Sequence, residues 1–597
     1  MAAPSPASID DSTISYSIKI NGTVLEDTIG IVSIITNYEI NRIPWAEIVL
    51  IDGKVEDDSS FPNSSSETFL PGNAIVISAG YNSINQDIFT GLIVKQSVKI
   101  NSSTSHLVIS CKHKAVAMTF DKKEAISQDK KDSDIISGII VNYSGLSATV
   151  EATTITHESM YQKLATDWDF ILSRADFCGL IVYYTMENIM IKAPPTSSAA
   201  VLTVAFGTSI FSFDAELNAE KQPTAVSASS WDAATLAMIS SSASEPVVNT
   251  QGNLVGDKLS KTLGQSGLKL NSGAPMSTDS LKKWADSSLL RMRLNAIKGR
   301  VSFQGSAKVM PGNIIVLEGV GDRFNGDAFV SSVTHTLENG EWVTAAKFGL
   351  DNKPVSELPN FSYSPAAGQL PSIHGLQVGV VKKLDADPLA EFRIQITLSA
   401  NTEADVLIWA RMSNFYATST SGSFFLPEIG DEVVVGFLEN NPAFPVILGS
   451  LYSKKNAAEL TVDSNNYLKG ITTKSKLKIA FDDDKKITKI STPGGNMITL
   501  DDDGKMVDIT DQNSNSIKMT SSGIEIKSAK DITLKATGKI ILDATAALSV
   551  TSKADVEVSG LNIKNTAQVG FAAKGNATAE ISASGQTTVK GAIVMIN

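Results

Sequence analysis

Cys111 and His113 lie two residues apart, so a strand would place both side chains on one face, as a metal site requires. A structural zinc ion takes four such ligands, and no further cysteine or histidine lies close by in sequence. The other histidines are scattered: His106, His157, His335 and His374. We therefore interpret this pair as structural and predict no metal.

Two acidic runs offer oxygen ligands of the kind that calcium prefers, Asp482–Asp484 and Asp501–Asp503. Neither has the spacing of a calcium-binding loop, so solvated turns are the preferred interpretation and calcium binding the alternative. Serine, histidine and aspartate form no recognised catalytic spacing, and the glycine-rich places lack the lysine of a phosphate loop. The sequence predicts neither an enzyme nor a bound cofactor.

The overall composition narrows the class of protein. A chain of 597 residues is too long to fold around a single hydrophobic core, and its length predicts about three to five domains. The net charge of -12 opposes binding to nucleic acid, which depends on lysine and arginine. Two cysteines give no disulfide framework, and the N-terminus has no signal-peptide pattern. We expect cytoplasmic assembly, and any action outside the cell would need another route of export.

Most of the chain reads as β structure. Alternating runs over 13–120 predict antiparallel sheet. Helices are predicted over 133–145 with Ser133 as N-cap, over 159–178 with Ser159 and Gln162 as a capping box, and over 279–297. The segment PGNAIVISAG at 71–80 resembles PGNIIVLEGV at 311–320, which favours two related barrels.

The predicted domains follow from these patterns. In chain order they are a first β-barrel at 1–130, an α/β segment at 131–221, an extended connection with a helix at 222–299, a second β-barrel at 300–353, a linker at 354–372, a five-stranded region at 373–456 and a repetitive region at 457–597.

The repetitive region carries the strongest signal. Residues 481–500 align without a gap onto 500–519, a period of nineteen. From residue 524 the period becomes eight, with two apolar residues in each octad: Ile524 and Ile526, Ile532 and Leu534, Ile540 and Leu542, Leu548 and Val550, Val556 and Val558. After a phase slip the pattern resumes at Leu561.

Each octad offers one buried face only, because residues i and i+2 of a strand point the same way. Eight residues extend about 26 Å, too short to turn three corners and return. The missing faces must come from other chains, most simply from two more copies. The repeat predicts a homotrimeric needle of triple-stranded β-helix.

The chain resembles the VgrG spike family of type VI secretion systems and the spikes of extracellular contractile particles. The stretch ATDWDFILSRADFCGLIV at 165–182 looks like the family's signature helix and strand, and the run from Asp387 to Tyr452 looks like its OB-fold neck. The signature residues are Trp168, Asp169, Phe170, Trp409, Arg411, Pro427, Gly430, Asp431 and Glu432. Two departures indicate a divergent branch: Asn440-Asn441-Pro442 replaces the usual Gly-Asp before the last proline, and no glycine precedes Arg393.

The resemblance implies a mainly β protein with a hub (1–353) of tandem tube-like β-barrels and a few short helices, an OB-fold neck (373–456) and a needle (457–597). It implies a spike that punctures an envelope mechanically, in brief contact with the target membrane. The implied partners are an Hcp-like inner tube protein, whose sixfold symmetry the hub would adapt to a threefold needle, baseplate proteins, effector cargo and a PAAR-like cone bound at Ile593, Val594 and Met595.

Two alternatives to a mechanical spike stay open, which makes three possibilities in all. A trimeric receptor-binding fibre or adhesin would also use a β-helix, although it would need a surface-binding tip domain. A third possibility is a spike that carries an enzyme, although neither an inserted hydrolase nor a C-terminal toxin is evident in the sequence.

Overall fold

The computed structural model describes residues 3–6, 13–53, 60–102, 104–232, 234–254, 256–357, 365–368, 370–399 and 406–596. Part of the predicted linker at 354–372 therefore lies outside the described residues. The chain divides into two compact units, Met1–Leu451 and Tyr452–Asn597. Among the described residues, none of the helices is both long and apolar enough to cross a membrane.

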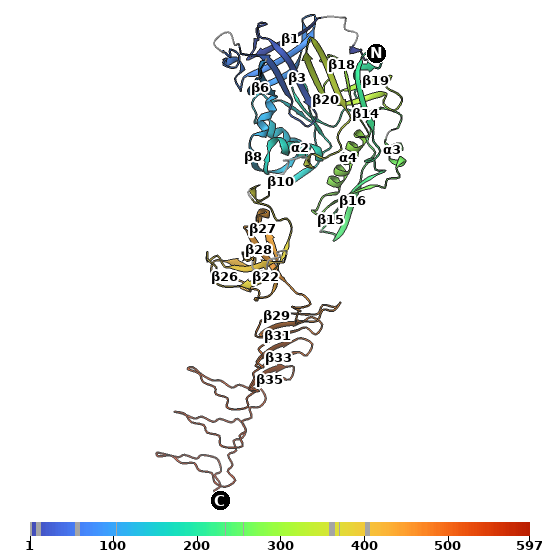
Figure 1. The fold of residues 1–597 in the computed structure, drawn as a ribbon. Coiled ribbons are helices and arrows are strands. Elements are labelled where there is room, and N and C mark those ends of the chain that lie inside the picture. Colours follow the sequence, from blue (N-terminus) through green and yellow to red (C-terminus); the bar gives the residue numbers. More distant parts are fainter. Residues whose placement is uncertain are drawn as a thin grey trace. The chain divides into compact units, whose positions relative to one another are not determined.

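The hub is built on one 13-stranded sheet (Figure 1). Its order is β14-β18-β21-β20-β3-β4-β7-β6-β5-β1-β2, with β19 joining β13 to β20. These strands are β1 Ile14–Ile20, β2 Thr23–Val24, β3 Ile31–Glu39, β4 Trp45–Ile51, β5 Ala74–Tyr81, β6 Ile84–Ile100, β7 Ser105–Lys112, β13 Ala200–Ala205, β14 Ile210–Leu217, β18 Ile297–Gln304, β19 Ile314–Glu318, β20 Gly326–Glu338 and β21 Glu341–Phe348.

The two hub β-regions, which the sequence predicts as tandem β-barrels, are joined by strand pairing. β3 pairs with β20 from Ser332 opposite Glu39 to Glu338 opposite Ser33, which joins the two β-regions into a continuous sheet. Two apolar cores lie along this sheet, one around Ile48 and Phe89 and the other around Phe303 and Phe348. Sequence periodicity cannot reveal this junction, because side chains alternate between the two faces in the same way whether a strand lies at a sheet edge or is paired on both sides.

The two β-regions share a local structure at the echoed PGN segments. Gly72 N donates to Ile93 O (2.8 Å) and Ile93 N to Asn73 O (2.9 Å), while Gly312 and Asn313 make the same pair of bonds with Val330. Both glycines need positive φ, +104° and +89°. A β-bulge follows each bonded residue, after Ile93 and after Val330. The sequence echo therefore corresponds to one structural device used twice.

Helices and small sheets complete the hub. The helices are α1 Asp132–Ile140, α2 Asp167–Phe177, α3 Asp257–Thr262 and α4 Thr278–Leu294, with short 3-10 turns at Glu67–Phe69, Lys114–Thr119 and Val355–Glu357. The small sheets contain β8 Lys122–Lys131 and β10 Thr156–Thr166, then β9 Ala148–Val150, β11 Ile181–Tyr184 and β12 Ile189–Lys192.

The helix predicted at 159–178 begins later than expected. Ser159 and Gln162 lie on β10, where Ser159 pairs with Gln128 of β8, so they form no capping box. Thr166 is the true N-cap of α2. The N-cap of α1 is Lys131 rather than Ser133. Cross-strand pairing with a distant segment overrode the local capping signal.

The interpretation of 222–278 as an extended connection is wrong. The segment contains β15 Val226–Asp232, β16 Ala237–Ser242 and β17 Leu268–Ser272, which form a three-stranded sheet with α4 packed against it. Val226, Ala228 and Ser230 alternate into its buried face. Their small side chains gave almost no hydrophobic periodicity, and the strands were missed for that reason.

The region at 373–456 has the five main strands that the sequence predicts. They form a closed barrel in the order β22-β23-β24-β28-β27. Their bounds are β22 Gln377–Lys383, β23 Arg393–Leu398, β24 Ile408–Met412, β27 Glu432–Phe437 and β28 Pro445–Leu451, and a short hairpin adds β25 Ala417–Thr418 and β26 Ser421–Gly422. One 3-10 turn, Pro365–Gly368, precedes the barrel, and another, Leu438–Asn440, lies between β27 and β28.

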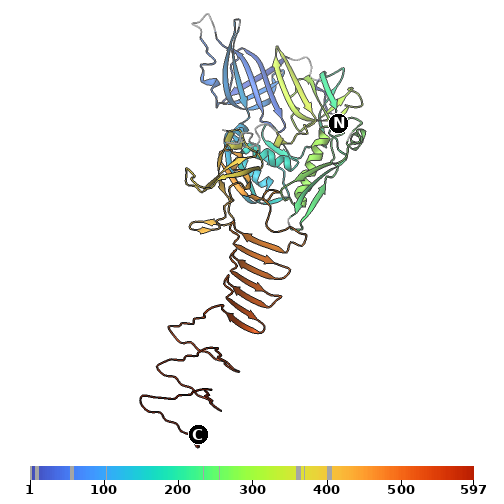
Figure 2. The same ribbon diagram turned by 60° about the horizontal axis from the view of Figure 1, so that its bottom comes forward.

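The second unit begins as a seven-stranded antiparallel meander (Figure 2). Its strands are β29 Leu468–Thr472, β30 Lys478–Asp482, β31 Ile487–Ser491, β32 Met497–Asp501, β33 Met506–Thr510, β34 Ser516–Thr520 and β35 Gly523–Lys527. β31 and β33 begin nineteen residues apart, as do β32 and β34. The predicted period of nineteen is therefore one hairpin of the meander.

Beyond β35 the chain runs as an open coil of wide turns (Figures 1 and 2). Its backbone bends at 529, 537, 545, 553 and 561, then at 568, 576, 584 and 592. The eight-residue rhythm predicted from the apolar pairs is thus a rhythm of the backbone. One step between bends is seven residues, from 561 to 568, which comes after the phase slip that the sequence predicts before Leu561.

Candidate functional site: the apolar face of the needle

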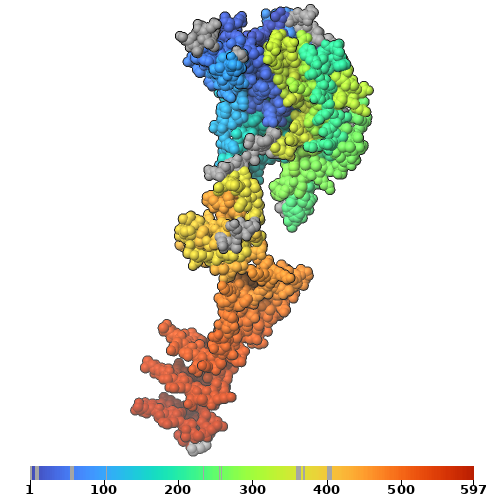
Figure 3. All heavy atoms as spheres, in the orientation of Figure 1, coloured from blue at the N-terminus to red at the C-terminus, as the bar shows by residue number. Residues whose placement is uncertain are grey.

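The ten apolar residues predicted as the needle core form a repeated exposed surface in the single chain. Their side chains are 54–70% exposed. Figure 3 shows the end of the chain as projecting loops with open space between them. Apolar side chains in such number have a strong tendency to leave water, and one chain gives them no core to enter.

The backbone of the same segment lacks partners as well. Within residues 530–596 as described, the structure contains neither a strand pair nor a backbone-to-backbone hydrogen bond. Each peptide unit there presents a donor and an acceptor that burial would leave unsatisfied. In the described single chain, the apolar side chains of this segment are therefore exposed, and its backbone is without backbone partners.

The meander above this coil has polar connections between successive turns. Asn496 Oδ1 accepts a hydrogen bond from Gln512 N (3.2 Å). Nineteen residues later, Asn515 Oδ1 accepts from Ala529 N (3.2 Å) and Ser528 Oγ (2.8 Å). The repeated asparagine therefore joins each turn to the next, and the second one lies where the meander gives way to the coil.

The acidic runs act as turn residues. Asp482 Oδ1 accepts from Lys485 N (3.1 Å), and Asp501 Oδ1 accepts from Gly504 N (2.7 Å). Asp503 pairs with Lys486 of the neighbouring turn. In the part of the chain that the structure describes, no three histidine, cysteine, aspartate or glutamate side chains lie close enough together to hold a metal ion. Cys111 and His113 therefore have no third ligand there.

Cys111 is buried in the hub core, and His113 is half-buried. Burial raises the pKa of the Cys111 thiol to about 12, so it stays protonated and unreactive near neutral pH. Burial also lowers the pKa of His113, with a smaller contribution from Lys114, to about 4. His113 Nδ1 accepts from Ala115 N (3.2 Å) and caps a short turn.

The signature residues of the hub lie in the first turn of α2. Trp168 and Phe170 are buried, and Asp169 bonds to the N-cap residue Thr166, seven residues after the N-cap predicted at Ser159. Asp169 N donates to Thr166 Oγ1 (3.0 Å), and Thr166 Oγ1 donates to Asp169 Oδ2 (2.7 Å). The stretch at 165–182 thus fixes where this helix begins and what it buries.

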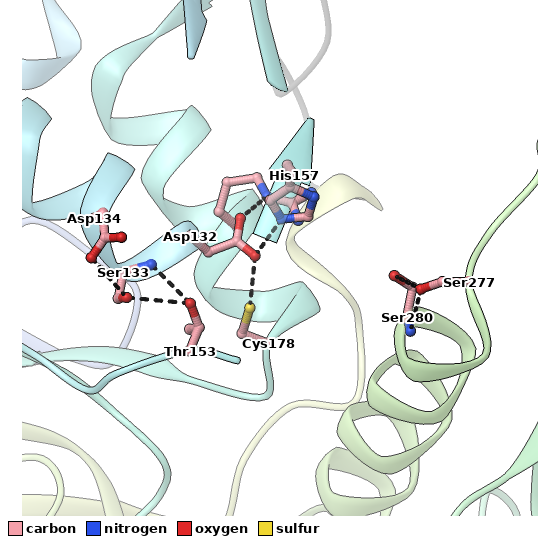
Figure 4. A network of polar contacts seen from close by, with 9 residues as sticks. Asp132, Ser133, Asp134, Thr153, His157, Cys178, Ser277 and Ser280 are labelled. Carbon is pink, nitrogen blue, oxygen red and sulfur yellow. Dashed lines mark hydrogen bonds and ion pairs between the residues drawn. The ribbon is translucent and has the colours of Figure 1, made fainter. Parts of the chain in front are cut away.

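Asp132, which the sequence analysis missed, is the centre of a polar network in the hub (Figure 4). Its buried carboxylate accepts from Arg174 Nε (2.6 Å), contacts His157 Nε2 (2.8 Å) and accepts from Cys178 Sγ (3.3 Å). Burial alone would raise the pKa of Asp132, but the hydrogen bonds and charges of Arg174 and His157 outweigh it, and the pKa is lowered.

Other polar groups fix the helix starts nearby. Ser133 N donates to Thr153 Oγ1 (3.0 Å), and Ser280 N donates to Ser277 Oγ at the start of α4 (Figure 4). The partners of Asp132 lie 25 to 46 residues away in sequence. No local motif could have indicated this network.

The barrel signature residues form two groups. Pro427, Gly430, Asp431 and Glu432 make the turn into β27, where Gly430 needs a positive φ of +94°. Gly430 N donates to Val381 O (2.9 Å), and Val381 N donates to Asp431 O (3.0 Å), which holds the turn against β22.

Trp409 and Arg411 form the second group, on β24, where Arg411 pairs with Arg393 of β23. The Arg393 side chain donates to Asp387 Oδ1 through Nε (3.0 Å) and Nη2 (2.6 Å). This hydrogen bond is the main reason that the pKa of Asp387 is lowered. The structure brings each barrel group together, while Trp168, Asp169 and Phe170 belong to the hub.

Family models match both parts of the first unit. The Alg8 N-terminal domain model matches residues 10–339, more than half of the chain. The model for the type VI secretion system/phage-baseplate injector OB domain matches residues 377–452. The chain belongs to the Alg8 N-terminal domain family. Together with the curated relatives below, these matches confirm the predicted resemblance to VgrG spike proteins.

Curated VgrG proteins match parts of the chain. Type VI secretion system spike protein VgrG1a of Pseudomonas aeruginosa is 34% identical over 150 residues, 24% of this chain and 23% of that protein. VgrG1b of the same species is 34% identical over 67 residues, 11% of this chain and 9% of that protein. These matches span less than a quarter of the relatives' length.

Solved structures resemble longer stretches of this VgrG-like chain. A 43 kDa prophage tail protein from Shewanella oneidensis is 10% identical and covers 57% of this chain and 99% of its own, with a TM-score of 0.44. The E. coli c3393 protein, a type VI secretion component, is 13% identical and covers 73% and 99%, with a TM-score of 0.38.

Proposed function

We propose that this chain is the hub and spike of a contractile injection machine and acts as a homotrimer that punctures a target envelope mechanically. One observation carries the proposal. From residue 530 the chain repeats an exposed apolar face every eight residues while its backbone has no partners of its own among the described residues. Two further copies would satisfy both requirements in a threefold prism.

The energetics favour a needle that forms only by association. Burying one apolar side chain contributes about 1.5–3 kcal/mol, whereas ordering one residue costs about 1–2 kcal/mol in backbone entropy. An octad with two inward side chains cannot offset eight ordered residues by burial alone. Interchain hydrogen bonds must supply the remainder, and the resulting shaft is stiff because its edges are paired.

The closed barrel is proposed as the OB-fold neck. Its order β22-β23-β24-β28-β27, with β24 and β28 parallel, supports this assignment, as does the OB-domain family match to residues 377–452. In this proposal the neck connects the hub to the needle within each chain. It requires no bound nucleic acid or sugar.

The hub is proposed to cap an Hcp-like inner tube and to contact baseplate proteins. The repeated PGN device gives each chain two similar β-regions, so three chains would present six. That count supports the predicted adaptation of a sixfold tube to a threefold needle. Effector cargo and a PAAR-like cone complete the proposed set of partners.

The test is the mass and shape of the purified full chain. We expect light scattering to give three copies and electron microscopy to show a threefold particle with a wide head and a thin needle. A cooperatively folded single chain at micromolar concentration would contradict the proposal. Binding to cell-surface sugars with loss of the needle shape would favour a receptor-binding fibre instead.

A further inference from the structure

A groove of about 1000 Å³ lies in the hub beside strand β17. Its apolar lining comes from three elements: Phe177 at the end of α2, Trp284 and Met292 on α4, and Leu268 and Leu270 on β17. The leucines are only half-buried. Residues far apart in sequence therefore form one trough along this strand, in which charged side chains such as Lys221 and Lys353 lie beside the apolar ones.

The edge of β17 next to the groove has no strand beside it in the described chain. β17 pairs with β15 alone, in parallel, from Val226 opposite Leu268 to Ser230 opposite Ser272. Leu268 N donates to Ala225 O, so Leu268 directs its peptide groups toward β15. In a parallel strand, the N–H and C=O groups of successive residues point to opposite edges. The backbone groups of Lys269 and Asn271 therefore point to the free edge of β17.

The opposite edge of this sheet differs. β16 also has a free edge, but its residues do not line the groove, and Met238 on it is 55% exposed. A strand added to the free edge of β16 would not contact the apolar walls of the groove. A strand added to β17 would place alternate side chains against the walls that α2 and α4 provide.

The charge of Lys269 indicates which residues the added strand should carry on its outer face. Lys269 is exposed and lies between the two leucines, so its side chain points to the other face of the sheet. It forms no ion pair among the described residues. A strand pairing with β17 would place a residue opposite Lys269, and opposite charges across a strand pair stabilise it.

We propose that β17 binds an extended segment of another polypeptide as a fourth strand, with apolar residues facing the groove and acidic residues beside Lys269. Main-chain hydrogen bonds supply affinity in this mode, and the trough selects alternate apolar side chains. The inference goes beyond the proposed function, because it requires neither the needle nor the trimer.

The first test uses the full chain and the labelled peptide Val-Glu-Val-Glu-Val, with binding followed by fluorescence anisotropy. Two versions are N-methylated, one at the valines and the other at the glutamates, which removes alternate N–H donors and keeps the side chains. We expect one version to lose affinity by at least about tenfold and the other to keep it. Equal affinity for both, or failure of the parent peptide to bind, would overturn the proposal.

The second test changes the strand. Lys269→Pro removes an outward N–H and leaves the bonds to β15 in place, whereas Lys269→Ala keeps that N–H. We expect the proline variant to lose binding by at least about tenfold more than the alanine variant, with the unfolding temperature of each recorded. Lys269→Glu, which keeps the backbone, should switch preference to Val-Lys-Val-Lys-Val.

Other occupants of the edge give distinct results. If a second copy of this chain pairs here, Lys269→Pro will lower the particle mass, and the proposal for another polypeptide fails. If another part of this chain covers the edge, neither parent peptide will bind to the wild type, which also overturns it. A needle that fails to trimerise leaves the peptide result unchanged, so the two proposals fail separately.

Discussion

The carboxylate of Asp132 is buried in the hub and holds α1, α2 and β10 together through Arg174 and His157. A buried ion pair is weak evidence of net stability, but removing one member leaves the other charge without compensation in a medium of low polarity. Replacing one charged residue in this core therefore lowers stability mainly because its partner is left with an uncompensated charge.

Asp132→Asn is expected to destabilise the hub at neutral pH by about 3 kcal/mol, because Arg174 loses its counter-charge. The pKa of Asp132 is lowered in the folded protein, so its contribution is present above the unfolded pKa of about 4 and is lost as pH falls through the folded pKa. The difference between variant and wild type should therefore shrink on acidification.

Urea unfolding of the hub transition between about pH 3 and pH 7 measures this difference. The control is Asp134→Asn, the same substitution at an exposed position of the same helix, which should change stability little at any pH. A gap that stays constant below about pH 4 would contradict the assigned role of Asp132.

Among elements, the meander and the coil differ in how they are held. The meander has its own strand pairs, whereas the coil has none in the described chain. Asn515 lies at the boundary and joins β34 to Ser528 and Ala529. The connection is short, so its loss should act locally.

Asn515→Ala should speed hydrogen exchange at Ala529 by about fivefold to tenfold, because a hydrogen bond of about 1 kcal/mol is lost. Mass spectrometry of a peptide that covers 523–532 can measure the change. Asn513→Ala is the matched control, since Asn513 contacts only Asp511 of its own turn in the described structure. Equal rates in both variants would show that Asn515 does not join the two segments.

Elements with strong periodicity could be predicted from sequence, and those defined by distant partners could not. The helix at 279–297 corresponds to α4, and the octads correspond to the spacing of backbone bends. The capping signal at Ser159 failed because β10 pairs with β8, and the small residues of β15 concealed a strand. The union of the hub β-regions through β3 and β20 joins residues about 300 positions apart, which no local pattern encodes.

At the scale of the whole molecule, the sequence KIILD offers a direct test of the trimer. Ile540 is predicted to point to the axis and the adjacent Ile541 away from it, although both are exposed in the single chain, by 54% and 77%. Ile540→Asp would bury three carboxylates in one layer, while Ile541→Asp would place them in solvent.

Light scattering should therefore find dissociated or aggregated Ile540→Asp and intact trimeric Ile541→Asp. The cost in the first variant follows from burying charge without a partner. If both variants keep the trimer, the inward face has been assigned wrongly. If both lose it, general needle fragility is the better explanation.

The tip prediction also belongs to the assembled particle. Ile593 and Met595 are 82% and 85% exposed, so they remain a proposed platform for a PAAR-like cone. Met595→Asp should abolish co-purification of the cone and leave the trimer of this chain intact. Retained cone in that variant would place the platform elsewhere.

In the proposed trimer, the regular bends of the coil mean that its length can change only in whole octads. Removing 545–552 deletes one whole interval between bends and turns everything downstream by one side of the prism, which leaves a threefold object looking the same. Removing 545–549 instead puts corners where flat sides should be. A spike shortened by eight should assemble, and one shortened by five should not, so particle mass after each excision shows whether needles of this kind grow and shrink by whole octads.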